Sequence, residues 1–212
     1  MKAAFALPLD RAERRLFRAV AGHRKPPSRP VRELAAIVGR GGGKDSIAAA
    51  LAAYVASTGD FTRLRPGERA SVLCIACDRT QAGIAFGYVR GLFENVPLLA
   101  GMVARITHDT IELINGAEII VATNSFRSVR GKTVILAIYD EVAFWASEDY
   151  ANPDFEVDAA ISPGLARYPG ALKIMISSAH KTSGLLYQRW KDYFARDDDD
   201  TLVVLGDTLT FN

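Results

Sequence analysis

A glycine-rich segment that contains a lysine is the first place in the sequence where chemistry is expected. Residues 39–46 read Gly-Arg-Gly-Gly-Gly-Lys-Asp-Ser and lie between an apolar segment and an alanine-rich one. Glycines let backbone N–H groups turn inward around a phosphate, and a helix that begins there adds positive potential. We expect this loop to bind nucleotide phosphates and Lys44 to reach the β- and γ-phosphates. The expected binding residues are Gly39, Arg40, Gly41, Gly42, Gly43, Lys44, Asp45 and Ser46.

This loop departs from the common phosphate-loop (Walker A) pattern at two positions. Val38 stands at the place of the first glycine, and Asp45 at the place of the hydroxyl residue that binds magnesium. Taken alone, the loop is also compatible with a glycine-rich turn that carries a solvent-exposed lysine. A carboxylate beside a triphosphate is tolerable only if a cation lies between them, so we expect Asp45 to bind Mg²⁺ directly or through water. The alternative is that Ser46 is the ligand and Asp45 faces solvent at the helix N-terminus, where the helix dipole favours an acid.

An acid pair follows an apolar segment further along the chain. Residues 134–139 read Val-Ile-Leu-Ala-Ile-Tyr and are followed by Asp140 and Glu141, the Walker B arrangement of ATPases with a catalytic glutamate. A buried parallel strand delivers its C-terminal residues to the ligand crevice. There Asp140 can hold Mg²⁺ and Glu141 can orient and deprotonate the attacking water.

A polar segment ends the next expected strand. Residues 177–180 read Ser-Ser-Ala-His directly after the apolar residues 171–176. Such a strand end beside the γ-phosphate can sense hydrolysis, although it can equally be a helix-capping loop before Ser183.

Strands and helices alternate around these motifs. We expect an alternating segment over 105–114 that turns at Asn115-Gly116, a strong hairpin signal, into a strand over 117–122. This order predicts an α/β fold with a mostly parallel central sheet flanked by helices. The other expected strands are 33–38, 71–77, 133–139, 171–176 and 202–205, and the expected helices are 11–21, 46–56, 80–94, 154–168 and 183–194.

The composition is that of a single globular domain. The chain has 212 residues, 49% of them hydrophobic, and it contains neither a long apolar span nor a signal-peptide pattern, so we expect an intracellular protein without a membrane segment. Cys74 and Cys77 lie three apart in an expected strand, where they would point to opposite faces and act as core residues rather than metal ligands.

Charge is distributed unevenly along the chain. Residues 1–30 hold eight basic against two acidic residues, a local excess of +6. Such a segment can meet a polyanion, or it can be a solvated amphipathic helix followed by a proline-rich linker. The acidic run 197–200 is expected to be a solvated loop.

Together the motifs at 40–44, 139–141 and 177–179 resemble the N-terminal ATPase domain of the large terminase subunit of tailed bacteriophages. The resemblance implies a P-loop NTPase of the additional-strand, catalytic-glutamate type that uses ATP and Mg²⁺ to pump double-stranded DNA into a procapsid. It makes Glu141 the catalytic carboxylate and Ser177, Ser178 and Ala179 the coupling motif. It also implies an arginine that reaches a neighbouring subunit's γ-phosphate, for which Arg130 is the better match and Arg127 the reserve. Either arginine can instead belong to a surface loop that touches DNA phosphates or nothing.

The resemblance further implies where and with what the protein works. The partners would be the portal protein, the procapsid, the small terminase subunit and further copies in a homo-oligomeric ring, in the cytoplasm of the infected bacterial host. We expect a basic arm at 1–30 and an ATPase domain at 31–212, with no nuclease domain after it and therefore no DNA cleavage. The alternatives are a helicase-like or other DNA-remodelling P-loop ATPase, and a nucleotide-gated binding module with weak hydrolysis. A nucleotide kinase is disfavoured because an Asp-Glu pair suits water activation.

Overall fold

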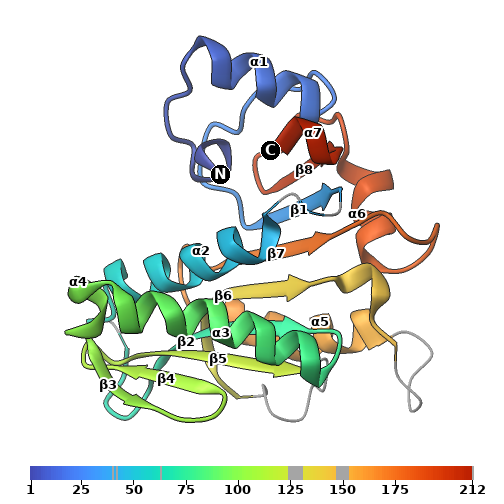
Figure 1. Cartoon of the computed structure of the whole chain (residues 1–212). Helices are drawn as coiled ribbons and strands as arrows, with labels where there is room; N and C mark the ends of the chain where they lie inside the picture. Colours follow the sequence, from blue (N-terminus) through green and yellow to red (C-terminus); the bar gives the residue numbers. More distant parts are fainter. Residues whose placement is uncertain (40, 42, 63, 124–130, 147–152, 212) are drawn as a thin grey trace.

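The centre of the molecule is a twisted sheet. The computed structural model describes residues 1–212 except 40, 42, 63, 124–130, 147–152 and 212. In this part of the chain eight strands pair in the order β3-β4-β5-β2-β6-β7-β1-β8 (Figure 1). The pairs from β5 to β8 are parallel, and the two pairs that β4 makes with β3 and β5 are antiparallel. The strands are β1 (Glu33–Val38), β2 (Ala70–Ala76), β3 (Val103–Ile106), β4 (Thr110–Leu113), β5 (Ala117–Thr123), β6 (Thr133–Asp140), β7 (Leu172–Ser177) and β8 (Thr201–Gly206).

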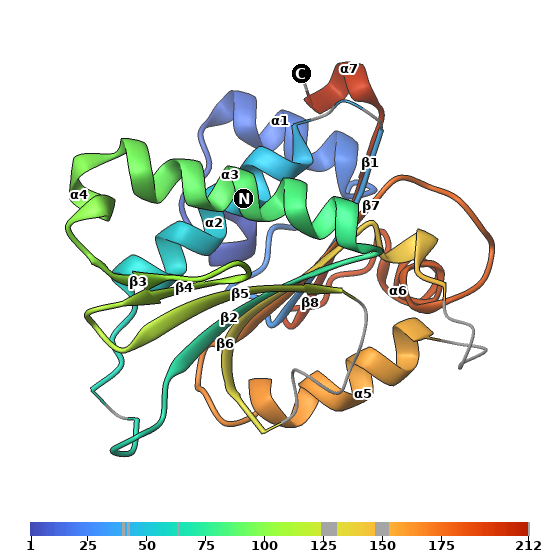
Figure 2. The ribbon, with the colours of Figure 1, turned by 60° about the horizontal axis from the view of Figure 1, so that its bottom comes forward.

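Helices cover both faces of this sheet. Figure 2 shows α1, α2 and α3 on one face and α5 on the other, with α6 beside it. On each face of the sheet, one apolar cluster of buried side chains fills the space between the helices and the strands. The predicted α/β fold with a mostly parallel sheet is confirmed. The helices are α1 (Arg11–Val20), α2 (Lys44–Thr58), α3 (Arg79–Asn95), α4 (Pro97–Ala100), α5 (Pro153–Leu165), α6 (Leu185–Tyr193) and α7 (Thr208–Phe211), with 3₁₀ turns η1 (Lys2–Phe5) and η3 (Val142–Phe144).

Continuous apolar runs form the central strands. Every residue of β2, β6 and β7 is buried, as expected for parallel strands that helices cover on both sides. Cys74 packs in the cluster under α2 and α3, whereas Cys77 packs against the cluster on the opposite face. Cys74 is buried, as predicted for a core residue, whereas Cys77 lies just after β2 and is only partly buried.

The segment 105–114 differs from the sequence-based expectation. It is not one alternating strand but parts of β3 and β4, joined by a tight turn at residues 107–109. The Thr107 N–H donates to the Thr110 carbonyl at 2.8 Å, and the Thr107 hydroxyl lies 3.2 Å from an Asp109 carboxylate oxygen. These local side-chain hydrogen bonds favour a turn over an extended strand. The predicted hairpin at Asn115-Gly116 joins β4 to β5, with Gly116 at a φ of 88°.

The N-terminal residues pack onto the sheet. Phe17 and Ala21 of the α1 region belong to the same buried cluster as Leu34 of β1. The linker that follows is held by the acidic run and the residue after it. The Lys25 N–H donates to Asp197 at 2.8 Å and Arg29 lies 3.1 Å from Asp200, while the buried Arg24 donates to the Thr201 carbonyl at 2.9 Å. Asp197, Asp199 and Asp200 are exposed, as predicted for a solvated loop, whereas Asp198 is partly buried. The contacts of the run with the linker were not predicted. The proposed division of the chain at residue 30 stays a prediction.

Within the described residues, the structure contains no helix whose length and apolar character would suit a membrane span.

Candidate active site

Three of the predicted motifs meet at one edge of the sheet. Strands β6, β7 and β1 are adjacent and parallel, so their carboxyl ends lie together. Asp140 of β6 pairs in register with Ile176 of β7, and Ser177 of β7 pairs with Ile37 of β1. The loop after β1, the acid pair and the serines therefore surround one point, as expected for the ligand crevice of an α/β sheet.

Two described glycines of the loop have positive φ angles. Gly41 and Gly43 adopt φ values of 76° and 66°, a region that side chains disfavour. Gly43 is the N-cap of the 15-residue helix α2 and makes no side-chain capping bond. The first N–H groups of this helix, at the end of the loop, therefore have no capping side chain and can bind an anion. Gly39 has no room for a side chain, because a Cβ there would lie only 2.5 Å from the Thr208 backbone nitrogen. Arg40 and Gly42 lie outside the described residues.

Lys44 and Glu141 form an ion pair across the site. The Lys44 Nζ contacts Glu141 Oε1, and the two side chains are only 13% and 20% exposed. The other carboxylate oxygen, Glu141 Oε2, accepts hydrogen bonds from the Ser177 hydroxyl at 3.0 Å and from the Ser178 N–H at 3.2 Å. The predicted phosphate-binding lysine, catalytic carboxylate and two coupling residues are thus joined by direct contacts. Ala179 follows them as an exposed residue.

The backbone at Glu141 is held in an uncommon conformation. Its φ of 49° lies in the left-handed region, which costs a non-glycine residue on the order of 1 kcal/mol. The surroundings fix this turn: the Ala143 N–H donates to the Ser177 Oγ at 3.3 Å, and the Trp145 indole donates to the Asp140 carbonyl at 2.9 Å. Rigid neighbours therefore direct the Glu141 carboxylate toward Lys44 rather than along the strand.

Asp140 is buried and incompletely paired. Asp140 is 8% exposed, and its Oδ1 has no hydrogen-bond partner among the described residues. Burial, together with the nearby negative charges of Asp45 and Glu141, raises the pKa of Asp140 to about 6, and Lys44 only partly opposes this. A buried carboxylate oxygen without a partner is costly unless a cation binds it.

These residues fit a magnesium ion. Asp140 supplies a free hard oxygen, and Asp45 at the start of α2 lies close enough to raise its pKa. Ser46, the alternative ligand, is exposed. No group of three or more His, Cys, Asp or Glu side chains in the described parts of the chain is arranged to hold a metal by itself. Mg²⁺ commonly binds one or two carboxylates and completes its shell with substrate phosphates and water, which the pair of Asp140 and Asp45 would allow.

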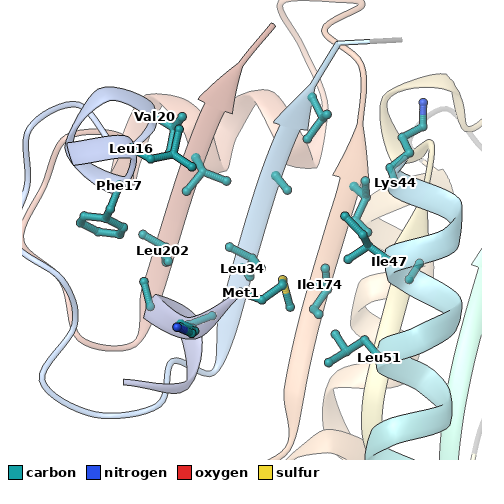
Figure 3. Close-up of a pocket in the computed structure, with 18 of the residues that line it drawn as sticks. Met1, Leu16, Phe17, Val20, Leu34, Lys44, Ile47, Leu51, Ile174 and Leu202 are labelled. Atoms are coloured by element: carbon teal, nitrogen blue, oxygen red, sulfur yellow. The ribbon is translucent and has the colours of Figure 1, made fainter. Parts of the chain in front are cut away.

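An apolar pocket beside the loop escaped the sequence analysis. It has a volume of about 390 Å³ and lies between the N-terminal segment, α2 and the strands β1, β7 and β8 (Figure 3). Lys44 stands at one end of it, and Leu16 and Ile47 face one another across it. Segments far apart in the sequence build this pocket, so no local pattern reveals it. Its labelled lining residues are Met1, Leu16, Phe17, Val20, Leu34, Lys44, Ile47, Leu51, Ile174 and Leu202.

A buried ionic cluster on the opposite face was also missed. Lys173 of β7 is 7% exposed and contacts Glu33 and Asp158, each at 2.8 Å. Arg189 contacts Glu33, and the Tyr139 hydroxyl donates to Asp158 at 3.0 Å. The only sequence signal was a lysine within an otherwise apolar strand.

Two predicted residues cannot be placed, because Arg127 and Arg130 lie outside the described residues. His23, His108 and His180 are exposed.

Solved structures with a similar fold include large terminases of bacteriophages. The large terminase of bacteriophage HK97 is 20% identical over 94% of this chain, with a TM-score of 0.68. The ATPase domain of the large terminase of Thermus phage P74-26 is 20% identical over 89% of the chain, with a TM-score of 0.56. The fold is that of a large terminase ATPase domain. No family profile and no curated protein matches the chain.

The extent of these alignments differs. This chain spans 39% of the HK97 large terminase and 72% of the P74-26 ATPase domain. A point mutant of the latter domain aligns over the same 89% of this chain at 19% identity and a TM-score of 0.56. The similarity to large terminases therefore concerns the fold of their ATPase region.

Proposed function

We propose that this chain hydrolyses ATP with Mg²⁺ as the motor domain of a phage DNA-packaging terminase. The observation that carries the proposal is the contact of one carboxylate, Glu141, with Lys44 on one side and with Ser177 and Ser178 on the other. A phosphate-binding lysine, a catalytic base and the end of a third strand are then linked directly. The terminase-type fold supports the same assignment.

Each residue has a role in this proposal. The Lys44 ammonium leaves Glu141 for the β- and γ-phosphates, because a polyphosphate carries more negative charge than one carboxylate. Glu141 is then free to orient a water and accept its proton. Asp140 and Asp45 would hold Mg²⁺, which supplies charge neutralisation at the phosphates. Ser177 and Ser178 would lose their hydrogen bonds to Glu141 if its carboxylate turned toward the attacking water. In this way the end of β7 would sense whether a nucleotide is bound.

The apolar pocket is the proposed site for the nucleotide base. It shares Lys44 with the phosphate loop, and its apolar walls suit a planar aromatic group. Leu16 and Ile47 are 45% and 47% exposed, so changing either to Gln should not disturb the fold. Each change should weaken ATP binding several-fold and leave inorganic tripolyphosphate unaffected. Equal loss for both ligands would place the base elsewhere.

The terminase assignment extends to the finer activity. Hydrolysis would drive double-stranded DNA through a homo-oligomeric ring on the portal of a procapsid, together with the small terminase subunit. Arg130, or Arg127 in its place, would complete the site of a neighbouring subunit. The isolated domain should then be mostly monomeric and turn over slowly, and Arg130→Ala should lower the rate only in an assembled motor.

Phosphate release with and without double-stranded DNA tests the proposal. Mg²⁺-dependent release that duplex DNA stimulates supports a DNA-translocating ATPase. ATP binding without measurable release, even in an assembled ring, would point to a nucleotide-gated binding module, and stimulation by single-stranded DNA alone would point to a helicase-like enzyme.

A further inference from the structure

Helix α1 carries a row of four arginines on one face. Arg11, Arg14, Arg15 and Arg18 are spaced at i, i+3, i+4 and i+7, which places them together on a helix. All four are exposed, while Phe17 on another face of the helix is buried in the core. With His23 after the helix they line a groove of about 810 Å³, which we name the α1 groove.

The positive charge of this groove is not neutralised within the chain. None of its four arginines forms an ion pair with any residue that the structure describes, and the one bond of Arg14 goes to the Leu9 carbonyl at 2.9 Å. Asp10, which also lines the groove, accepts the Glu13 N–H at 2.8 Å as the helix N-cap.

The rest of the basic N-terminal segment behaves differently. The Arg24 guanidinium bonds to backbone carbonyls beside the acidic run, and Arg29 lies 3.1 Å from the Asp200 carboxylate. The fold therefore supplies partners for Arg24 and Arg29, as it does for Lys2 through Glu13, but no acidic partner among the described residues for the four arginines of α1. Like charges at i and i+4 repel one another and destabilise a helix, so an anion in the groove would stabilise it.

The residue type and the spacing of the row indicate the ligand. The planar guanidinium binds two phosphate oxygens at once, which an ammonium group cannot do. Seven residues of helix extend about 10 Å, and phosphates follow one strand of B-DNA about every 3.4 Å along the axis. Several phosphates of a duplex therefore lie within the length of the row, and each guanidinium can bind one of them through two oxygens.

We propose that the α1 groove binds the phosphodiester backbone of duplex DNA. Arg11, Arg15 and Arg18 contact the phosphates through their guanidinium groups, and Arg14 adds its free nitrogens. The contacts are to phosphates only, so binding is independent of base sequence. The choice of duplex DNA rests on the proposed function, whereas none of the four arginines lines the apolar pocket assigned to the nucleotide base.

Fluorescence anisotropy of the full chain with a short DNA duplex, measured without nucleotide over a range of salt concentrations, tests this proposal. A triple Arg→Gln variant at positions 11, 15 and 18 spares the bond of Arg14 and the buried face of the helix. Each phosphate contact contributes about 0.9 to the slope of log K against log salt. We expect the slope to fall by about 2 to 3 and the affinity at about 0.1 M salt to fall at least tenfold.

A matched control removes the same charge elsewhere. Arg65, Arg79 and Arg105 are exposed and form no ion pair in the described parts of the chain, so their triple Gln variant tests net charge alone. Equal losses in both variants would overturn the proposal, as would an unchanged slope in the α1 variant. Binding of polyglutamate in preference to the duplex would assign the groove to an acidic protein and overturn the proposal as well.

ATP affinity, measured in parallel, should be unchanged in the α1 variant. If the wild-type chain failed to bind ATP, the proposed function would be refuted, while the assignment of the α1 groove to DNA would be unaffected.

Discussion

Replacing Asp140 with Asn should stabilise the metal-free protein at neutral pH. Burial and neighbouring carboxylates raise the pKa of Asp140 from 3.8 to about 6. A folded-state pKa above the unfolded one means that ionisation opposes folding, so stability falls as pH rises from about 4 to about 6. Two units at about 1.4 kcal/mol each give an upper limit near 3 kcal/mol. The amide stays neutral, so we expect the variant to gain about 1 to 3 kcal/mol at pH 7.5 and little at pH 4.5.

Urea unfolding of both proteins in EDTA at the two pH values measures this gain. Mg²⁺ with ATP should stabilise the wild type and have much less effect on the variant, because the amide is a poorer magnesium ligand than the carboxylate. Asp192→Asn, which removes a partly exposed charge on α6, serves as the control for the loss of one carboxylate. A variant that is less stable than the wild type in EDTA at pH 7.5 would refute the argument that Asp140 is an uncompensated buried charge.

The remaining predictions concern the loop and the buried ionic cluster. Lys44→Ala should weaken ATP binding at least tenfold in calorimetry, because the charge that faces the phosphates is lost, and unchanged affinity would refute the loop assignment. Asp45→Ala should lower ATP affinity with Mg²⁺ about tenfold but leave metal-free ATP binding no weaker; an unchanged magnesium dependence there, with its loss in Ser46→Ala, would give the role to Ser46. Lys173→Met should cost about 3 kcal/mol in urea unfolding, since Glu33 and Asp158 then keep Arg189 alone as a cationic partner among the described residues, and a loss below about 1 kcal/mol would show that Arg189 and water suffice to balance them.

Local patterns in the sequence were sufficient for the sheet and for the neighbourhood of the motifs. Apolar runs that end in functional residues, such as the run before Asp140, predict buried parallel strands whose ends share one edge. The turn at residues 107–109 was missed because it depends on the hydroxyl of Thr107 and the carboxylate of Asp109 rather than on glycine or proline.

Contacts between distant segments were beyond the sequence analysis. The motifs predicted Lys44 and Glu141 as separate functional groups but not the ion pair between them, because that pair depends on the left-handed turn at Glu141. The cluster around Lys173 and the apolar pocket likewise join residues from opposite ends of the chain. Alternation of polar and apolar residues reveals which face of an element is buried, but not which charged groups meet there.

The central claim is that Glu141 is the base for ATP hydrolysis at a site where Lys44 binds the phosphates. Glu141→Gln keeps the shape of the side chain and removes both the base and the negative charge that Lys44 contacts. Measured side by side, the variant should bind Mg²⁺-ATP at least as tightly as the wild type, because Lys44 no longer has to leave a carboxylate, and should release phosphate at least a hundredfold more slowly. Loss of ATP binding, or turnover at the wild-type rate, would contradict the account.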